Sequence, residues 1–503
     1  MLRFENIWVA DGTGAEPFRA DVLTDGAFIA AVERQKIAGI SAADTVDGRG
    51  LILAPGFIDA HGHSDLSLLA APEAESKITQ GVTTEIAGNC GLSAFPLTSL
   101  NREHLEKLYA VYGQELEWTD HRSYMARLRD KRPAMRLACL CGHNTLRAAV
   151  AGYEKPHLAE EELAEMEKLL DRALADGALG LSTGLLYVPG KFADRDELVR
   201  LLRVVAAHGG VFATHLRSEG NQLLESLAET LEYARAAGVE KVQISHFKTA
   251  GKDNWSKISA AIRLLEEARA SGIEVTVDRY PYLESMTQLS VMLPPPWDDL
   301  DDVEIRSRLQ NPETRAQLAA ELRRIRPPDY WHRVRLAASS APKWRGKCGL
   351  LLDALGDDPA ATVTEILADD APSACGAFLG MCEANLERIL ALDYCMPGSD
   401  GNALPADGAF GAAHPRAFGA IAKFIRRRLD AAGSIGDAVR RATSLPAGVF
   451  GLADRGRLAP GYAADLVLFD PDAIDSAADF SSPRRPASGI ALTVTGGRTV
   501  FRA

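Results

Sequence analysis

The sequence predicts an α/β protein: a (β/α)8 TIM barrel, a small β-sandwich domain formed by both termini, and an insertion after the seventh barrel strand. Three observations support this prediction. Short apolar segments alternate with longer amphipathic ones through the middle of the chain, strand-like segments occupy both ends, and one charged stretch interrupts the alternation. Strand and helix alternating eight times are typical of a barrel with parallel strands.

Both ends of the chain contain short strand-like segments separated by turns. Apolar and polar residues alternate in them, and Asp-Gly pairs mark hairpin turns near the N-terminus. Such segments lie at 1–14, 21–33, 44–55, 461–471 and 490–503. Because the ends of a compact chain often lie close together, we expect residues 1–55 and 457–503 to form one β-sandwich domain.

The middle of the chain, residues 56–456, contains the predicted barrel. Its eight strand candidates are 51–59, 82–88, 136–143, 179–186, 211–216, 241–246, 274–282 and 392–400. Helical periodicity is found between them at 159–176, 195–208, 221–237 and 256–271.

The stretch between the seventh and eighth strands is too long for one loop and one helix. It includes the segment LPPPWDDLDD and continues as a charged helical pattern. We expect residues 284–349 to form an inserted subdomain near the barrel mouth.

The composition argues against several classes of partner. The chain has 503 residues, 47% of them hydrophobic, and a net charge of −12 without a Lys/Arg-rich block, so nucleic acid and anionic membranes are poor partners. No apolar run reaches the length of a membrane span, and the first residues lack the apolar core of a signal peptide. Seven scattered cysteines favour a reducing cytoplasm over a disulfide framework.

The chemistry of a barrel enzyme lies at the C-terminal ends of its strands. Five of the eleven histidines follow predicted strands: His61, His63, His143, His215 and His246. Cys90 follows strand two, in GNCG, and Asp400 follows strand eight. Imidazole and thiolate are preferred zinc ligands, and residues two apart on a strand share one face. The sequence therefore predicts a metal site at the barrel mouth, with the histidines of HGH as part of it.

Each of these residues also has a structural alternative. A single histidine at a strand end can be a hydrogen-bonded core residue, and Cys90 can be a small buried apolar residue. For His143 the alternatives are a structural role, or a role in the substrate site beside the metal or at the oxyanion. GSDGN around Asp400 is also good turn sequence. Arg416 taken alone reads as a surface arginine on a helix.

The motifs together resemble a known family. APGFIDAHGHSD and RGRLAPGYAADLVLFDP are similar to segments of the amidohydrolase superfamily. More narrowly, GVTTEIAGNCGLS, THLRSEG, ISHFKTAG, DRYPY, GSDG and HPRAFGA resemble the D-aminoacylases, the N-acyl-D-amino-acid deacylases, over essentially the whole chain. The resemblance implies a zinc-dependent hydrolysis of N-acyl-D-amino acids, a small-molecule substrate, that releases a carboxylate and a D-amino acid.

The resemblance also implies ligands for two metal positions. It assigns Cys90, His215 and His246 to a tightly held zinc. His61 and His63 become ligands of a second, weaker or empty position, with Cys90 able to bridge. Bound zinc lowers the pKa of its water to ~7 and polarises the amide carbonyl.

Further roles follow from the same resemblance. Asp400 becomes the catalytic acid/base, and Arg416 holds the substrate carboxylate together with Tyr280, for which Tyr282 is the alternative. Lys248 resembles a family lysine that lines the site.

The sequence departs from other branches of the superfamily at strand four. It reads GLSTGLLYVPG and has no lysine at its end, where hydantoinases and dihydroorotases carry a modified lysine that bridges two metals. Hydrolysis of cyclic amides or of D-residue dipeptides is thus the weaker hypothesis. A non-catalytic barrel is a third, and it is disfavoured because the whole set of candidate ligands is present.

Overall fold

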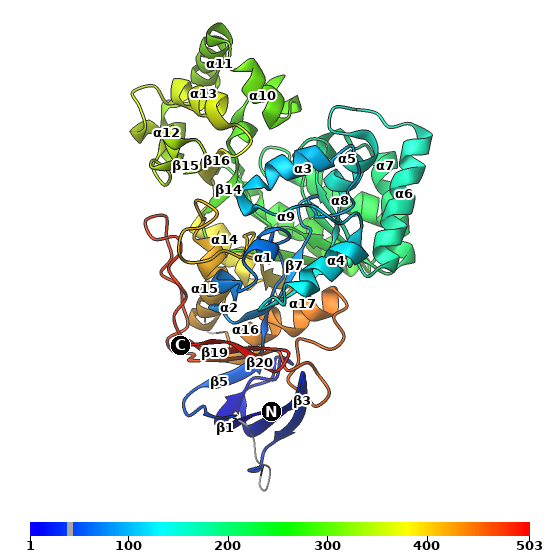
Figure 1. Cartoon of the computed structure of the whole chain (residues 1–503), viewed down its shortest axis with the longest axis vertical. Coiled ribbons are helices and arrows are strands. Elements are labelled where there is room, and N and C mark those ends of the chain that lie inside the picture. Colours follow the sequence, from blue (N-terminus) through cyan, green and yellow to red (C-terminus); the bar gives the residue numbers. More distant parts are fainter. Residues whose placement is uncertain (38–43, 432) are drawn as a thin grey trace.

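The computed structural model describes residues 1–37, 44–431 and 433–503, so that residues 38–43 of the predicted 1–55 segment lie outside the described residues. Three parts follow one another along the long axis of the molecule. Figure 1 shows a small sheet of blue and red strands at the bottom, the barrel in the middle, and a green and yellow-green insertion at the upper left.

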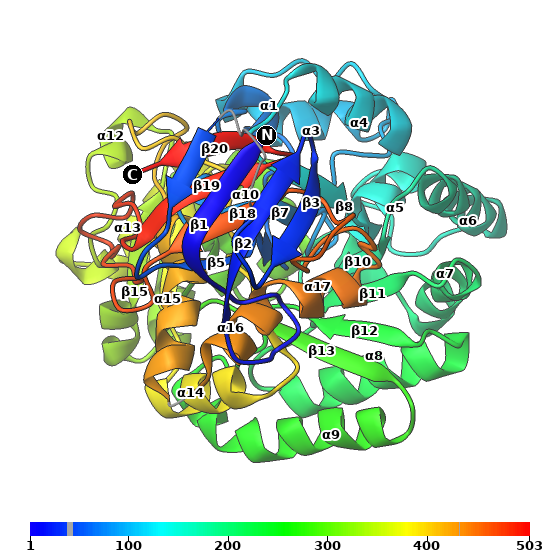
Figure 2. The same cartoon turned by 90° about the horizontal axis from the view of Figure 1, so that it is seen from below.

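The small sheet combines both ends of the chain, as predicted. Its strand order is β20-β19-β18-β5-β1-β2-β3, with β4 paired to β1. Antiparallel pairing of β18 with β5 joins the C-terminal strands to the N-terminal ones, and Figure 2, seen from below, shows them side by side in front of the barrel. The bounds are Leu2–Val9 for β1, Phe18–Asp25 for β2, Phe28–Glu33 for β3, Asp44–Asp47 for β4, Ile52–Pro55 for β5, Leu466–Phe469 for β18, Ile490–Thr495 for β19 and Arg498–Arg502 for β20.

All eight predicted barrel strands form. They are β6 (Phe57–Asp59), β7 (Val82–Ala87), β8 (Arg136–Cys139) continued by β9 (Cys141–Gly142), β10 (Gly180–Gly184), β11 (Val211–His215), β12 (Lys241–Ile244), β13 (Glu274–Arg279) and β17 (Cys395–Pro397). Neighbouring strands are parallel, and the Ala60 N–H, which donates to Pro397 O at 3.0 Å, connects the first strand to the last. The barrel therefore places every strand end on one rim.

The first predicted strand, 51–59, is two strands in different sheets. The chain changes sheets at Gly56, whose N–H donates to Asp465 O in the small domain (2.7 Å), while the next N–H, of Phe57, donates to Gly81 O in the barrel (2.9 Å). A Cβ at Gly56 would lie 2.2 Å from Thr83 Oγ1, so that only glycine fits this crossing. The apolar run is continuous because both strands are buried.

Amphipathic helices surround the barrel. The four predicted helical stretches correspond to α6 (Glu160–Ala175), α7 (Arg195–Ala207), α8 (Leu223–Ala237) and α9 (Ile258–Ala270). The other helices outside the insertion are α1 (Ser67–Ala70), α2 (Glu75–Ile78), α3 (Arg102–Leu108), α4 (His121–Asp130), α5 (His143–Ala151), α14 (Glu383–Ala391), α15 (Arg416–Asp430), α16 (Ile435–Ala442) and α17 (Ser444–Val449).

Local sequence explains these helices. In α7, for example, the Asp194 carboxylate caps the first turn by accepting the Glu197 N–H, and Leu198, Leu202 and Val205 are buried on one face. None of the helices in the described ranges combines the length and the apolar content needed to cross a bilayer.

The insertion has its own sheet and its own core. Strands β14 (Glu284–Gln288), β16 (Cys375–Leu379) and β15 (Val334–Ala338) pair antiparallel in that order, and the sheet thus continues beyond the predicted 284–349. Its helices are α10 (Asp302–Arg308), α11 (Pro312–Ile325), α12 (Pro342–Arg345) and α13 (Pro359–Asp370). A separate apolar cluster, running from Leu289 to Ala374, packs between these elements.

Candidate metal centre

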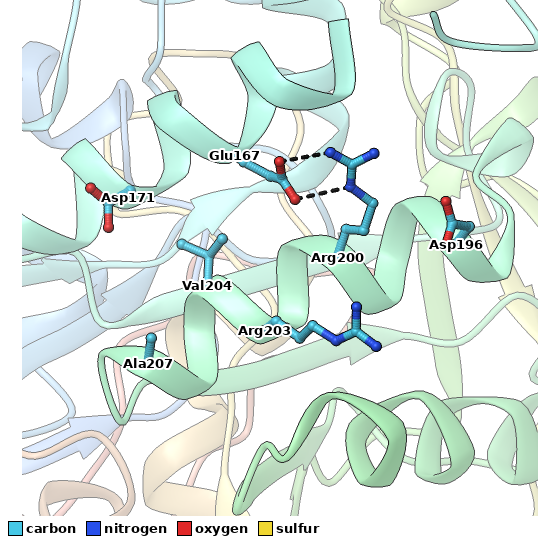
Figure 3. A pocket seen from close by; sticks show the side chains of 7 residues that line it. All are labelled: Glu167, Asp171, Asp196, Arg200, Arg203, Val204 and Ala207. Carbon is cyan, nitrogen blue, oxygen red and sulfur yellow. Dashed lines mark hydrogen bonds and ion pairs between the residues drawn. The ribbon is translucent and has the colours of Figure 1, made fainter. Parts of the chain in front are cut away.

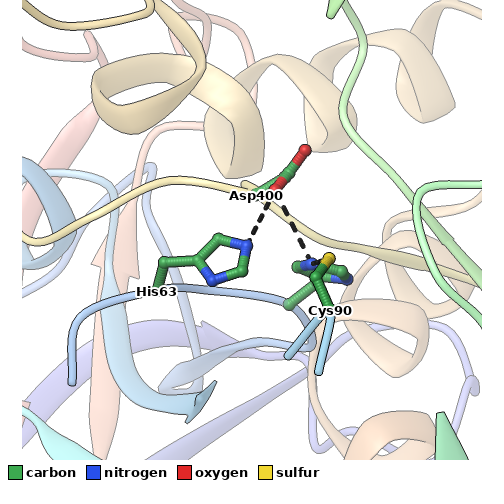
Figure 4. A group of neighbouring side chains, drawn as sticks. His63, Cys90 and Asp400 are labelled. Carbon is green, nitrogen blue, oxygen red and sulfur yellow. Dashed lines mark hydrogen bonds and ion pairs between the residues drawn. The ribbon is translucent and has the colours of Figure 1, made fainter. Parts of the chain in front are cut away.

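Side chains from five barrel strand ends converge into two overlapping groups of potential metal ligands. The ligand atoms of Cys90, His215 and His246 all lie within 4.8 Å of one another. The same holds for His61, His63, Cys90 and Asp400, so that Cys90 belongs to both groups. Figure 4 shows Asp400 above His63 and the Cys90 thiol. The structure therefore brings the predicted ligands together around one shared sulfur atom.

Cys90 is held in a strained turn between two imidazoles. It has a positive φ of 54°, and the following Gly91 (φ 76°) packs so closely that a Cβ there would lie 2.1 Å from Asn144 Oδ1. Its Sγ is 3.4 Å from both His61 Nε2 and His246 Nε2. Burial would raise the pKa of this thiol, but the two imidazoles outweigh burial and hold the pKa well below its usual value. The thiolate form of Cys90 is therefore favoured.

His215 gives the clearest indication that this site binds a metal ion or another ligand. The side chain is buried, and neither ring nitrogen has a hydrogen-bond partner among the described residues. The nearest carboxylate oxygen, Glu219 Oε2, is 3.8 Å from its Nε2. Buried polar atoms without partners are costly unless a ligand satisfies them. One thiolate and two imidazoles are a donor set that zinc prefers, and three ligands leave its fourth position open.

Asp400 lies beside this cluster with its two oxygens in different surroundings. Oδ1 is 3.0 Å from His63 Nε2, and Oδ2 is 2.8 Å from Arg416 Nη1. The backbone has a φ of 49°, and its N–H donates to His61 O at 2.7 Å, which fixes the loop after β17 against the HGH segment. Burial would raise the pKa of Asp400, but the Arg416 guanidinium and the neighbouring imidazoles keep it well below the usual range.

The candidate carboxylate clamp contains one tyrosine next to the arginine. Arg416 begins α15, and its guanidinium lies 4.8 Å from the centre of the Tyr280 ring. Tyr280 is fully buried, and its hydroxyl has no hydrogen-bond partner among the described residues. The Tyr282 hydroxyl instead points to the Pro415 carbonyl at 3.5 Å. The contacts thus single out Tyr280 rather than Tyr282.

Lys248 interacts with the metal cluster through Glu219. Its Nζ is 2.5 Å from Glu219 Oε1 and 2.9 Å from His246 Nδ1. Burial and Lys248 lower the pKa of His246, but Glu219 and the Cys90 thiolate raise it more, to about 10.

His143 lies in a buried ionic group. It starts α5, and its Nε2 is 2.7 Å from Glu197 Oε1, to which Arg147 Nε also donates at 3.1 Å. These contacts connect α5 to α7.

A buried lysine that was not among the predicted site residues connects the strand ends near the ligands. Lys77 Nζ lies 2.7 Å from Asp59 Oδ2, 2.8 Å from Glu85 Oε2 and 2.7 Å from Ser399 Oγ. These partners come from the ends of β6 and β7 and from the loop that precedes Asp400. Nothing in the sequence around Lys77 marks it, because an isolated lysine in a short helix reads as a surface residue.

Other missed residues lie inside motifs that the sequence reasoning quoted. Asp278 is the first residue of DRYPY and Glu219 is the glutamate of THLRSEG, four positions after His215. Tyr187, in GLLYVPG, has its ring 5.0 Å from that of His215 and its hydroxyl 2.9 Å from Thr287 Oγ1 of β14. That contact connects the barrel rim to the insertion.

A surface hollow of about 540 Å³ lies elsewhere, between α6 and α7 (Figure 3). Two of its charged side chains pair with each other, since Arg200 Nη2 and Nε donate to Glu167 at 2.9 and 3.0 Å. None of its lining residues belongs to the ligand groups: Glu167, Asp171, Asp196, Arg200, Arg203, Val204 and Ala207.

The chain is similar to known proteins over almost its whole length. The model of the amidohydrolase family matches residues 44–314 and 397–501. The chain is 35% identical to an N-acyl-D-glutamate deacylase of Alcaligenes xylosoxydans xylosoxydans, over 99% of this chain and 93% of the relative.

Two solved structures are also similar. One is an N-acyl-D-glutamate deacylase of Bordetella bronchiseptica, complexed with zinc and a phosphonate inhibitor that mimics the tetrahedral intermediate (32% identity, TM-score 0.83, 99% and 96% of the two chains). The other is a D-aminoacylase with a binuclear metal centre, described as activated by one metal and attenuated by the second (32% identity, TM-score 0.82, 100% and 96%).

Proposed function

Because this chain belongs to the amidohydrolase family, we propose that it is a zinc-dependent hydrolase of the amide bond in N-acyl-D-amino acids, releasing a carboxylate and a D-amino acid. Relatives at 32–35% identity over nearly the whole chain act on such substrates, and one of them binds zinc. The observation that carries the proposal is the convergence of Cys90, His215 and His246, beside a carboxylate that is itself paired with an arginine.

The metal is held by Cys90, His215 and His246 in this proposal. One of the two His215 nitrogens, which have no hydrogen-bond partner among the described residues, gains the metal as its partner, and the Cys90 thiolate supplies the negative charge. Zinc bound there lowers the pKa of a water molecule to ~7 and polarises the amide carbonyl. His61 and His63 provide a second, weaker position that shares Cys90.

Asp400 moves the protons. Its low pKa keeps it ionised, so that Oδ1 can accept a proton from the attacking water. It then delivers that proton to the amide nitrogen as the carbon–nitrogen bond breaks, and the amine leaves. The contact between Oδ2 and Arg416 keeps the carboxylate in one orientation through both transfers.

The substrate carboxylate needs a local cation, because the protein as a whole is negatively charged. Arg416 is the nearest guanidinium to Asp400, and a guanidinium can hold a carboxylate through two parallel hydrogen bonds. The free hydroxyl of Tyr280 next to it supports a joint clamp. Lys248, which pairs with Glu219, adds a second positive charge to the site.

A substrate panel tests the proposal. The zinc-loaded protein is incubated with the N-acetyl derivatives of D- and L-glutamate, D- and L-methionine, and with hydantoins, and the released amino acid is quantified. We expect release of D-amino acids and little from the L-forms. Opening of hydantoins alone, or hydrolysis of the L-forms alone, would contradict the proposal. The acidic and apolar members of the panel also measure the side-chain preference.

A further inference from the structure

Asp278 contacts residues from both ligand groups. It lies near the end of β13 and is fully buried. Its Oδ1 accepts the backbone N–H of His246 at 2.9 Å, and its Oδ2 is 3.2 Å from Nδ1 of His61. Gln243 Nε2 donates to the same Oδ2 at 2.5 Å. One carboxylate therefore contacts the backbone N–H of His246, a ligand of the tight position, and the imidazole of His61, a ligand of the second position.

These contacts decide which nitrogen of His61 is available to a metal. A histidine that ligates a metal keeps its ring hydrogen on the other nitrogen, and Asp278 Oδ2 is placed to accept that hydrogen from Nδ1 of His61. The lone pair then lies on Nε2, which faces the Cys90 sulfur at 3.4 Å. Glu219 is placed in a similar way at His246, since its Oε1 is 2.9 Å from Nδ1 while Nε2 faces Cys90. Lys248 Nζ, which donates to the same Oε1, also lies 2.9 Å from that Nδ1.

We propose that Asp278 is a positioning residue that makes His61 a ligand of the second metal position without controlling the tight position. The inference rests on the proposed zinc binding, not on the substrate. Carboxylates that accept from the second nitrogen of a ligating histidine fix its tautomer and its ring orientation. Here that role is separate for each position: Asp278 sets the tautomer of His61, and Glu219 that of His246.

The substitution Asp278→Asn tests this role because the neighbouring hydrogen bond from His246 fixes how the new amide group is oriented. The backbone N–H of His246 can only donate a hydrogen bond, so the oxygen of the new amide must remain beside it as the acceptor. Its NH₂ group then faces His61 Nδ1 and Gln243, whose own amide can turn to accept. His61 Nδ1 has to become an acceptor, the imidazole hydrogen moves to Nε2, and the ring can no longer ligate through that atom.

Glu219→Gln is the matched control. Glu219 Oε1 faces both Lys248 Nζ and His246 Nδ1, and an ammonium group only donates. The amide oxygen therefore stays on that side and continues to accept from His246. Both variants remove one negative charge next to a ligating imidazole, but only Asp278→Asn reverses a tautomer.

Zinc titration with equilibrium dialysis and metal analysis distinguishes the variants. We expect two zinc ions per wild-type chain and per Glu219→Gln chain. Asp278→Asn should keep the tight zinc and lose affinity at the second position by about 10- to 100-fold. Two zinc ions bound to Asp278→Asn at wild-type affinity, or loss of both positions together, would overturn the inference. Equal loss of the second zinc in Glu219→Gln would overturn it too, because charge alone would then be responsible.

A measurement on the unchanged protein keeps the test independent of folding in the variant. Long-range ¹H–¹⁵N correlation spectra of histidine-labelled, zinc-loaded protein report which ring nitrogen carries the hydrogen. We expect the Nδ1–H form for His61, and the Nε2–H form would contradict the role of Asp278. A wild-type chain that binds no zinc at all contradicts the proposed function as well, which separates the two failures.

Discussion

Replacement of Asp400 by asparagine should remove proton transfer while leaving the site assembled. Arg416 only donates hydrogen bonds, so the amide oxygen takes the place of Oδ2 beside it. The NH₂ group then takes the place of Oδ1, 3.0 Å from His63 Nε2. A proton acceptor becomes a donor at the one oxygen that faces the ligand cluster, with almost no change in volume.

The expected loss is large. General acid–base catalysis by a positioned side chain contributes about 10²- to 10⁴-fold to the rate. At ~1.4 kcal/mol for each factor of ten, this is about 3 to 5 kcal/mol of activation free energy. The loss should fall on kcat, because Cys90, His215 and His246 remain in place and the zinc content at the tight position should be unchanged.

The assay compares kcat on an N-acetyl-D-amino acid with the zinc content of the same preparation. Asp407→Asn is the matched control, because this aspartate lies exposed in the same loop and only caps the Ala409 N–H. The control should keep wild-type kcat. Activity of Asp400→Asn within about threefold of wild type, with zinc bound, would remove Asp400 from the proton-transfer step.

Three further changes test other parts of the site. Lys77→Met leaves two buried carboxylates without their cation and should lower the free energy of unfolding by about 3 to 5 kcal/mol; urea unfolding within ~1 kcal/mol of wild type would show that the cluster is dispensable. Arg416→Lys cannot form two parallel hydrogen bonds with the substrate carboxylate and should lower kcat/KM by about 10- to 100-fold. Because Arg416 also contacts Asp400, the methyl ester of the same substrate should lose some kcat/KM as well, but less than the free acid, and an equal loss on both would refute the clamp. Since His246 has a pKa of about 10 in the metal-free chain, it is protonated at pH 7 and zinc must displace that proton. Affinity should therefore fall as the pH is lowered, and calorimetry in buffers of different ionisation enthalpy should detect proton release; zinc binding without it would contradict this protonation state.

The barrel and the convergence of the candidate ligands at its mouth were predictable because both depend on local signals. Apolar segments of strand length end at His61, His215 and His246, and a barrel brings all such ends to one rim. His61 and His63 stand two positions apart in the short segment that directly follows β6 (Phe57–Asp59). Cys90 was predictable only through its GNCG context, since a single cysteine otherwise reads as a core residue.

The remaining features depend on contacts that have no local pattern. Asp278 and His61 are 217 positions apart, and nothing in either segment indicates the pairing. The change of sheet at Gly56 is hidden because β5 and β6 are both buried, so the run is apolar throughout. The insertion continues to β16 because this strand pairs with β14 across about ninety residues, again without a local signal.

The central claim is that Cys90, His215 and His246 hold the zinc that supports hydrolysis. Crystals grown with one equivalent of zinc and measured at the zinc absorption edge test it most directly. We expect one anomalous peak within bonding distance of these three side chains, about 2.3 Å from the sulfur and ~2.0–2.1 Å from the two nitrogens. A peak held by His61 and His63 without His215, or no peak in protein that hydrolyses its substrate, would contradict it.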